Sequence, residues 1–393
     1  MKYFVVTFGC QMNHSDSEKI NIMLSKKYKP ASDIKEADLV VINMCSVRQS
    51  AVNRVYGLLP KLKGKKTILT GCILKKDKLK MAKIFDEIKK PEELIKNYQS
   101  ISGLIPIMRG CNNFCSYCVV PYTRGRETSR PAEEIICEAK RLARSRVKEI
   151  WLLGQNVNSY KYNFPKLLRK INKIPGKFWI RFTSSHPKDF STDLIKVMKE
   201  CKKITPYLNL PAQSGDDAIL KKMNRPYTIK KYKEIIKKVR KAIPDIAIST
   251  DIIVGFPGET KKQFENTKKL FKQVKYDMAY INRYSPRYGT EAFKLKDNVA
   301  PKEKARRERE LTDILRKTAL EKNKNFVNKI VEVLAQEYKD GFLSGKTFHY
   351  KSVKLKGKKD FVGKFCKVKI TSALPWGLGG EIKKPLESSS SGS

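Results

Sequence analysis

Three cysteines, Cys111, Cys115 and Cys118, form a CxxxCxxC motif in the segment LIPIMRGCNNFCSYC. Soft thiolates suit both zinc and iron–sulfur sites. A structural zinc ion needs four closed ligands, usually in two pairs, and no fourth Cys or His follows at suitable spacing, because His186 is far along the chain. An iron–sulfur cluster held by three cysteines keeps one iron open to a ligand. The motif therefore favours such a cluster over zinc or inert thiols.

A second set of cysteines stands directly after apolar, β-rich runs: Cys10 in TFGC, Cys45 in INMC and Cys72 in LTGC. The carboxyl ends of parallel strands share one edge of a sheet, where ligands bind. Thiols delivered to that edge can converge on one metal site, and the repeated placement favours a second cluster over small buried side chains. The remaining cysteines lie on apolar faces and are predicted to be core: Cys137, Cys201 and Cys366.

The composition points to a folded, strongly basic protein. The 393 residues include 83 Lys and Arg against 39 Asp and Glu, a formal net charge of +44. Such a charge favours a polyanionic partner, although solvated lysines alone would give the same count. No apolar run approaches the ~20 residues of a membrane span, and no export signal precedes the first cysteine. We expect a cytoplasmic protein with reduced cysteines and no membrane partner.

The elements that position these cysteines follow three patterns along the chain. Residues 1–98 alternate β-rich runs with helical stretches, which predicts a parallel α/β domain. Residues 99–325 hold six strand-like runs alternating with amphipathic helices, which predicts a complete or partial (β/α) barrel with its chemistry at the carboxyl ends of the strands. Residues 326–385 predict a small antiparallel β-barrel of a kind that often binds oligonucleotides. Residues 386–393, rich in Ser, are predicted to be a disordered tail.

Both cysteine sets, with Tyr117 before the last cysteine and a small β-barrel at the end, resemble the radical S-adenosylmethionine (SAM) methylthiotransferases over all but the tail. The resemblance implies an N-terminal cluster domain, a radical SAM barrel and a TRAM domain. It also implies two 4Fe-4S clusters. Cys10, Cys45 and Cys72 would hold an auxiliary cluster that carries sulfur, and the CxxxCxxC cysteines would hold a cluster whose open iron is chelated by SAM.

Several motifs are similar to the tRNA branch of this family, which converts isopentenyladenosine beside the anticodon into its 2-methylthio derivative: TFGCQMNHSDSEKI, NMCSVR, CNNFCSYCVVPYTRGRE, LLGQNVNSY, RFTSSHPKDF and DIIVGFPGET. The resemblance implies two SAM molecules per turnover. One gives a methyl group to sulfur, and the other makes a 5′-deoxyadenosyl radical that removes hydrogen from C2 of the adenine. A C–H bond at an aromatic carbon is not acidic, so a hydrogen-atom abstractor is needed there.

Cofactor contacts are assigned to four residues near the mouth of the predicted barrel. Tyr117 belongs to the cluster loop, Gly154 and Gln155 end the second strand, where the family contacts the SAM amino group, and Gln213 ends a later strand. Asp251 and Arg283 also end strands at that side. Each of these polar side chains could equally have its hydrogen bonds satisfied within the protein at a strand end. His186 precedes Pro187 in a turn-like segment and is interpreted as structural.

RNA contacts are predicted in two places. Arg124, Arg126 and Arg130 follow the cluster loop and suit bidentate phosphate contacts, unless they belong to a solvated loop. The second group mixes cations and aromatics as RNA surfaces do, although a plain β-barrel face would look similar. It comprises Lys346, Phe348, Tyr350 and Lys351.

Two other functions compete with the main hypothesis. A methylthiotransferase acting on threonylcarbamoyladenosine or on a ribosomal protein would use the same chemistry, but that tRNA branch usually has Lys and Val at Gln11 and Met12. An iron–sulfur RNA-binding regulator would lack catalysis, and it has no need of the open iron that CxxxCxxC leaves. Besides tRNA, the enzyme hypothesis implies an electron donor and a sulfur donor as partners.

Overall fold

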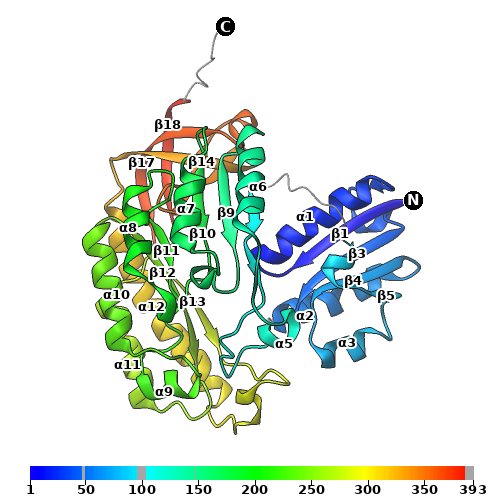
Figure 1. Ribbon diagram of the computed structural model, residues 1–393, viewed down its shortest axis with the longest axis horizontal. Coiled ribbons are helices and arrows are strands. Elements are labelled where there is room, and N and C mark those ends of the chain that lie inside the picture. Colours follow the sequence, from blue (N-terminus) through cyan, green and yellow to red (C-terminus); the bar gives the residue numbers. More distant parts are fainter. Residues whose placement is uncertain (47–48, 95–102, 146, 386–393) are drawn as a thin grey trace.

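The N-terminal domain is built on a parallel five-stranded sheet in the order β2-β1-β3-β4-β5 (Figure 1). The computed structural model describes residues 1–46, 49–94, 103–145 and 147–385. The three long strands of this sheet are β1 (Lys2–Phe8), β3 (Leu39–Cys45) and β4 (Lys66–Cys72). The edge strands, β2 (Lys29–Pro30) and β5 (Glu87–Ile88), have two residues each, too few to show a period in the sequence.

Alternate residues of β3 serve the two faces of this sheet. Leu39 and Val41 pack in a cluster with Ile20 of helix α1 (Gln11–Ser25). Val40, Ile42 and Met44 pack with residues of α2 (Gln49–Leu58) and α3 (Lys75–Met81). All seven residues of β3 are buried, as expected of a parallel strand covered on both faces. A short helix, α4 (Pro91–Leu94), follows β5.

The middle of the chain forms an open barrel of parallel strands, as the sequence predicted. One three-stranded sheet pairs β6 (Leu104–Pro106), β9 (Glu149–Leu153) and β10 (Trp179–Phe182). The other pairs β11 (Tyr207–Asn209), β12 (Ala247–Val254) and β13 (Met278–Arg283). A parallel bridge between Ile180 and Ile204 connects the two sheets.

Helices cover the outside of this barrel (Figure 1). The predicted ones are α6 (Ala132–Arg144), α7 (Phe164–Asn172), α8 (Thr192–Glu200), α10 (Ile229–Ala242), α11 (Lys261–Val274) and α12 (Pro301–Lys324). Two short helices were not predicted, α5 (Val120–Arg124) and α9 (Asp217–Lys222). Within the described ranges, no helix combines the length and apolar character that crossing a membrane requires.

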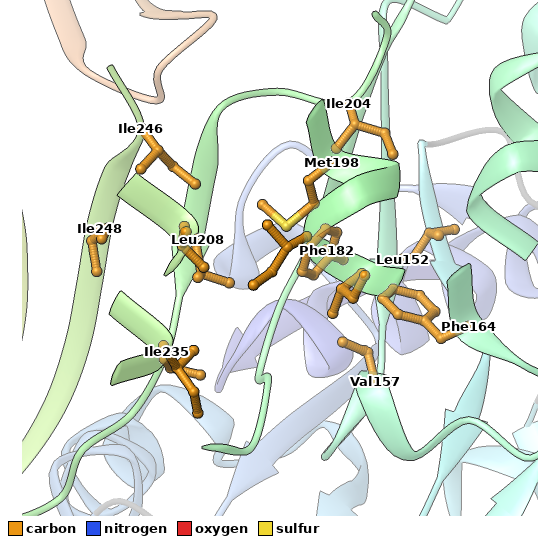
Figure 2. Close-up of a cluster of buried hydrophobic side chains, with 14 of the residues drawn as sticks. Leu152, Val157, Phe164, Phe182, Met198, Ile204, Leu208, Ile235, Ile246 and Ile248 are labelled. Carbon is orange, nitrogen blue, oxygen red and sulfur yellow. The ribbon is translucent and has the colours of Figure 1, made fainter. Parts of the chain in front are cut away.

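The apolar core of the barrel lies between its strands and these helices. Figure 2 shows Phe182 and Leu152 of the strands beside Phe164 at the start of α7, and the rings of Phe164 and Phe182 meet edge to face with centroids 5.2 Å apart. The same cluster continues through Leu208 and Ile235. Strand positions in the barrel are therefore fixed by close packing, which keeps the loops at the strand ends in place.

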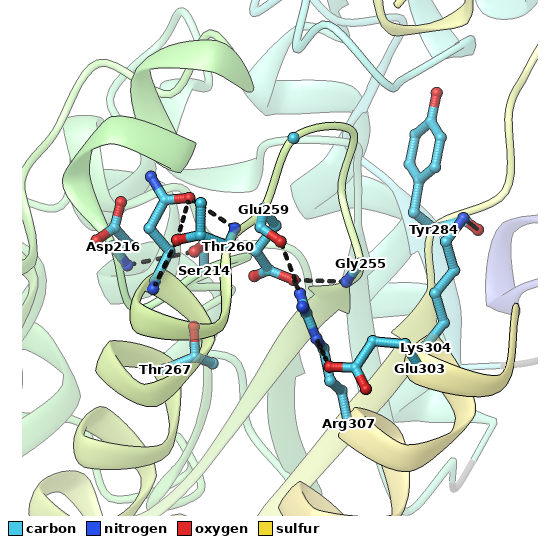
Figure 3. Close-up of polar contacts among 12 residues, drawn as sticks. Ser214, Asp216, Gly255, Glu259, Thr260, Thr267, Tyr284, Glu303, Lys304 and Arg307 are labelled. Atoms are coloured by element: carbon cyan, nitrogen blue, oxygen red, sulfur yellow. Dashed lines mark hydrogen bonds and ion pairs between the residues drawn. The ribbon is translucent and has the colours of Figure 1, made fainter. Parts of the chain in front are cut away.

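A buried ion pair anchors α12 to the carboxyl end of β12 (Figure 3). Glu259 and Arg307 are each 3% exposed. The Glu259 carboxylate accepts hydrogen bonds from Arg307 Nη1 at 2.7 Å and from the backbone N–H of Gly255 at 2.6 Å. Glu303 accepts from Arg307 Nε at 2.8 Å. The motif DIIVGFPGET therefore holds a loop at the strand end rigid through charge-assisted hydrogen bonds.

The C-terminal part is a closed five-stranded barrel in the order β14-β15-β16-β18-β17. Its strands are β14 (Ile330–Lys339), β15 (Phe342–Thr347), β16 (Ser352–Lys356), β17 (Phe365–Leu374) and β18 (Gly377–Pro385). The expected barrel was antiparallel, and four of the pairings are, but β16 and β18 pair in parallel. Cys366 lies in its core with Val368 and Ile370, and Cys201 lies in the core of the (β/α) barrel, as predicted. The prediction that Cys137 is core is wrong, because its side chain lies on the exposed side of α6.

This barrel docks on the (β/α) barrel through the segment between β15 and β16. Arg181 of β10, with a side chain 0% exposed, donates to the carbonyls of Thr347 at 2.9 Å and Phe348 at 3.1 Å. The ring of Tyr350 lies 5.2 Å from Trp151, centroid to centroid. Lys351 Nζ donates to Asp277, the residue before β13, at 2.7 Å.

This docking also shows where the residues of the second RNA prediction lie. Phe348 packs with Trp179, Lys351 is 7% exposed, and Lys346 Nζ lies over the Tyr350 ring at 4.5 Å and donates to Ser352. These contacts place the segment in a domain junction, while Lys346, Phe348 and Tyr350 stay partly exposed, and their contact with RNA stays a prediction. The predicted boundary at residues 98 and 99 and the predicted tail, 386–393, lie outside the described residues.

Candidate metal centres and cofactor site

The N-terminal thiol group, defined as Cys10, Cys45 and Cys72, lies at the carboxyl edge of the N-terminal sheet. Cys45 and Cys72 end neighbouring strands and stand opposite each other in the register of β3 and β4. Cys10 follows β1, on the other side of β3, and is the N-cap residue of α1. Parallel strand order therefore delivers the three thiols to one edge, as the sequence predicted for their placement.

A glycine permits the close approach of the two strands at this edge. Gly71 has φ +108°, and a Cβ there would lie 2.2 Å from the carbonyl oxygen of Met44 and 2.5 Å from Asn43 Oδ1. Asn43 is itself held by Asn13 of α1, whose Nδ2 donates to it at 2.8 Å. The glycine before Cys72 is therefore required by space and by backbone conformation together.

Cys45 and Cys72 are 5% and 3% exposed. A hydrogen bond with Cys45, together with burial, raises the pKa of Cys72 well above the ordinary value of a thiol, and the positive charge of Arg124 acts against this rise. Metal ligation needs thiolates, and a bound cation lowers thiol pKa values strongly. Buried, adjacent thiols at a sheet edge therefore fit a site that is completed by a positively charged metal centre.

Arg124 comes from the (β/α) barrel, yet its side chain reaches this thiol group. Nε donates to Cys72 Sγ at 2.8 Å, and Nη2 lies 3.9 Å from Oδ2 of Asp16 in α1. The Arg124 side chain is 9% exposed. Burial lowers its pKa, but the charges of Cys72, Asp16 and Cys10 raise it further, and the net direction is upward. The structure therefore places Arg124 against the N-terminal thiol group, and its contact with RNA phosphates stays a prediction.

The loop thiol group, defined as Cys111, Cys115 and Cys118, lies in the loop that the short pairing of β7 (Met108–Arg109) with β8 (Thr128–Ser129) closes. Cys111 and Cys115 are 8% and 9% exposed. The loop is braced from α9, because Ser116 donates through its backbone N–H to the Met223 carbonyl at 3.0 Å and through Oγ to the Lys222 carbonyl at 2.8 Å.

Polar groups also face these thiols. Asn113 Nδ2 donates to Cys111 Sγ at 3.4 Å, and Arg225 Nη1 donates to Cys115 Sγ at 3.5 Å. Burial raises the pKa of Cys111 and raises that of Cys118 to about 12, with the charge of Cys115 as the next cause for Cys118. Arg225, which sequence analysis missed, is 7% exposed and also donates to the Tyr227 hydroxyl at 3.0 Å.

The donor sets fit iron–sulfur clusters better than single ions. In the part of the chain that the structure describes, all nine cysteines are free, and no three His, Cys, Asp or Glu side chains converge tightly enough to hold one metal ion. A four-iron cube binds each thiolate at a different iron, so its ligands need not converge on a point. The two sets of three thiols, in which Cys10 is exposed and Cys118 is partly buried, match that requirement.

Unpaired polar atoms gather in the loops after β9 and β10. Among the described residues, Gln155 Oε1, Ser185 Oγ and His186 Nε2 are buried and have no hydrogen-bond partner. These loops leave the carboxyl ends of the strands, the side from which the loop thiol group also extends. Buried polar atoms are rarely left unpaired, so these atoms suit a polar ligand, and the contact of Gln155 with SAM stays a prediction.

The other predicted cofactor residues lie in different settings. Gly154 is packed so closely that a Cβ would meet Met108 Cγ at 2.5 Å. Gln213 has φ +66° and bridges to β12 at Ile252. Tyr117 packs beside the apolar cluster that includes Phe256, and burial raises its pKa well above the ordinary value.

Arg283 ends β13, as predicted, but Asp251 lies inside β12 and not at its end. Arg283 is exposed and pairs with Glu308 at 3.1 Å. Asp251 Oδ2 accepts from Asn209 Nδ2 at 3.1 Å. His186 is buried, and its Nδ1 accepts from the Lys188 backbone N–H at 3.2 Å. Burial, followed by the charges of Arg225 and Lys188, lowers the pKa of His186 to about 2, so its ring is neutral.

The two remaining arginines of the first RNA prediction differ in exposure. Arg126 is exposed, with its guanidinium 4.2 Å from the centroid of the Phe114 ring. Arg130 donates to the Pro106 carbonyl at 2.8 Å and pairs with Glu138 at 2.9 Å. Arg130 therefore braces the barrel, and Arg126 keeps a surface position from which it can meet a partner.

Comparisons with known proteins agree with this geometry. The radical SAM superfamily profile matches residues 105–271, and that of uncharacterized protein family UPF0004 matches residues 2–90. The chain is 40% identical over 433 aligned positions to the tRNA-2-methylthio-N(6)-dimethylallyladenosine synthase of Clostridium tetani, with 96% of each chain covered. It is 41% identical to the synthase of the same name from Clostridium novyi, covering 97% of this chain and 96% of that one.

A solved structure shows a similar fold. The radical SAM methyltransferase TsrM from Kitasatospora setae, with cobalamin and a [4Fe-4S] cluster bound, aligns with a TM-score of 0.55 at 12% identity. The alignment covers 74% of this chain and 77% of TsrM.

Proposed function

This chain belongs to the family of the tRNA-2-methylthio-N(6)-dimethylallyladenosine synthases, and we propose that it adds a methylthio group to C2 of isopentenyladenosine adjacent to the anticodon in tRNA. As a member of that family it is a radical SAM tRNA methylthiotransferase that uses SAM and 4Fe-4S clusters. Its net charge of +44 suits a polyanionic RNA substrate.

We propose the N-terminal thiol group as the ligands of an auxiliary cluster and the loop thiol group as the ligands of the SAM cluster. When bound, these groups supply an electron for SAM cleavage and sulfur for transfer, chemistry that protein side chains lack. The chain's own residues exclude water from the four buried thiols, those of Cys45, Cys72, Cys111 and Cys115. Arg225 and Asn113 hold the loop thiols in orientation through hydrogen bonds to Cys115 and Cys111.

The observation that carries this proposal is the pair of three-thiol groups, one at the carboxyl edge of the N-terminal sheet and one in the loop after the first barrel strand. The helix α5, which begins two residues after Cys118, ends in Arg124, whose side chain contacts Cys72 of the other group. The two groups are therefore neighbours. The proposed reaction needs this, because a radical made at one centre leads to sulfur transfer from the other.

SAM contacts are proposed at the unpaired polar atoms of Gln155, Ser185 and His186. The predicted contacts of SAM with Tyr117, Gly154 and Gln213 are part of the same proposal. Arg126 is proposed as a phosphate contact, because it is exposed beside the loop thiol group. An electron donor and a sulfur donor are proposed as partners, and the cytoplasm as the location, since all nine described cysteines are free.

The substrate is tested by an anaerobic reaction of the reconstituted, reduced protein with SAM and one of two tRNAs, carrying isopentenyladenosine or threonylcarbamoyladenosine. We expect the methylthio nucleoside from the first tRNA alone, measured by mass spectrometry of the digested RNA. Product from the second tRNA alone would move the assignment to the other tRNA branch. Binding of either tRNA without SAM cleavage by the iron-loaded protein would indicate a regulator instead.

A further inference from the structure

We infer that Arg124 is a positioning residue of the auxiliary cluster: a cation that the (β/α) barrel places against the sulfur ligands of the N-terminal domain and that raises the reduction potential of the cluster there. The inference rests on the proposed function, because it takes the N-terminal thiol group as cluster ligands. It assigns to this arginine an electrostatic task that the ligands themselves cannot perform.

The first observation is the position of the guanidinium. Arg124 Nε donates to Cys72 Sγ at 2.8 Å, although 52 residues separate the two in sequence and they belong to different domains. The side chain is 9% exposed, so water screens its charge little. A hydrogen bond from a cation to a ligand sulfur stabilises the more negative, reduced form of a cluster, and hydrogen bonds to sulfur are among the factors that set cluster potentials.

The second observation is an unused donor. Among the described residues, Arg124 Nη2 is buried and has no hydrogen-bond partner, and neither has the facing Asp16 Oδ2, 3.9 Å away. Leaving such a donor unpaired is costly unless another acceptor is present. If Cys72 holds the auxiliary cluster, a sulfur of that cluster would lie within reach of Arg124 Nη2 and would accept its hydrogen bond.

The third observation is that separate contacts hold the domains together around Arg124. Arg109 Nη2 donates to Asp16 Oδ1 at 3.1 Å, so the same carboxylate ties α1 to the barrel without touching a thiol. Arg287, from the loop after β13, donates to Gln49 of α2 at 3.3 Å.

The test isolates the auxiliary cluster in the full chain by changing Cys111, Cys115 and Cys118 to Ala together. After anaerobic reconstitution, one electron from dithionite converts the oxidised 2+ cluster to its paramagnetic 1+ form, and electron paramagnetic resonance follows that signal against applied potential. In this background we expect Arg124→Gln to shift the midpoint to more negative potential, because a positive charge beside the sulfurs is lost. Arg124→Lys, which keeps the charge, should recover most of the shift.

Two matched variants separate this effect from general charge and from docking. Arg54→Gln removes an exposed arginine of α2 in the same domain, and Arg109→Gln breaks the docking ion pair without touching a thiol. Both should leave the midpoint at the value of the parent protein. An unchanged midpoint in Arg124→Gln would overturn the inference, as would an equal shift in Arg109→Gln. Failure of the triple-alanine protein to take up any cluster would instead overturn the ligand assignment of the proposed function.

Discussion

Replacing Arg181 with Met should weaken the junction between the two barrels more than any exposed substitution there. The Arg181 side chain is 0% exposed, pairs with Glu149, and donates to the carbonyls of Thr347 and Phe348. Removing one partner of a buried ion pair leaves an uncompensated charge, at a cost of about 3–5 kcal/mol. The two carbonyls lose their donors at the same time, so we expect the upper part of that range.

Lys177 is the matched control, because it pairs with Glu332 across the same junction but is 56% exposed. An exposed pair contributes only about 0–1 kcal/mol, so Lys177→Met should change stability little. Replacing both Glu149 and Arg181, as Gln and Met, should destabilise less than Arg181→Met alone, since no charge is then left unpaired.

The assay is urea unfolding of the iron-loaded protein under anaerobic conditions, followed by tryptophan fluorescence. Trp151 and Trp179 lie 5.7 Å and 5.1 Å from the Arg181 guanidinium, so their emission reports the junction directly. Equal unfolding midpoints for Arg181→Met and Lys177→Met would refute the reasoning, because burial would then not change how much an ion pair contributes to stability.

Two further predictions concern the sites. Gly71→Ala should destabilise the protein by at least ~2 kcal/mol and lower the iron bound by the N-terminal thiol group, because its φ of +108° and the Met44 carbonyl leave no room for a Cβ. Gly57→Ala, in helix α2 with open space around it, is the control and should stabilise slightly. For His186, the folded pKa of about 2 lies below the ordinary ~6.5, so the unfolded chain binds a proton that the folded chain does not. Stability should therefore fall as pH drops below about 6.5, by about 2 kcal/mol between pH 7 and pH 5, and urea unfolding of His186→Gln should show a flatter pH dependence. An identical pH slope in the variant would exclude His186 as the cause.

The cysteine placement could be predicted from the sequence because it depends on local order. A cysteine at the end of a buried parallel strand lies at the carboxyl edge of the sheet, independently of the rest of the fold. Cys45 and Cys72 lie together because their strands are neighbours. Local order also predicted the (β/α) barrel, because strand-like runs alternate with helices, and it predicted that the site lies at the carboxyl ends of its strands. The short edge strands β2 and β5 and the parallel pairing of β16 with β18 have no comparable local pattern.

Contacts between domains could not be predicted in this way. Arg124 sits among other arginines after the cysteine motif, and nothing nearby in sequence indicates that its partner is Cys72, 52 residues earlier. Tyr350 and Lys351 belong to a mixture of cations and aromatics that is equally suited to RNA and to the buried face of Trp151 and Asp277. Composition describes what such a segment can bind, and only the docked structure shows which surface it meets.

The division of labour between the two thiol groups is tested most directly by one anaerobic turnover with SAM and isopentenylated tRNA, in which mass spectrometry measures 5′-deoxyadenosine and the methylthio nucleoside together. The parent protein should yield both products, Cys115→Ala neither, and Cys72→Ala 5′-deoxyadenosine without the methylthio nucleoside. Undiminished methylthio nucleoside from Cys72→Ala, or 5′-deoxyadenosine from Cys115→Ala, would contradict the assignment of the two centres.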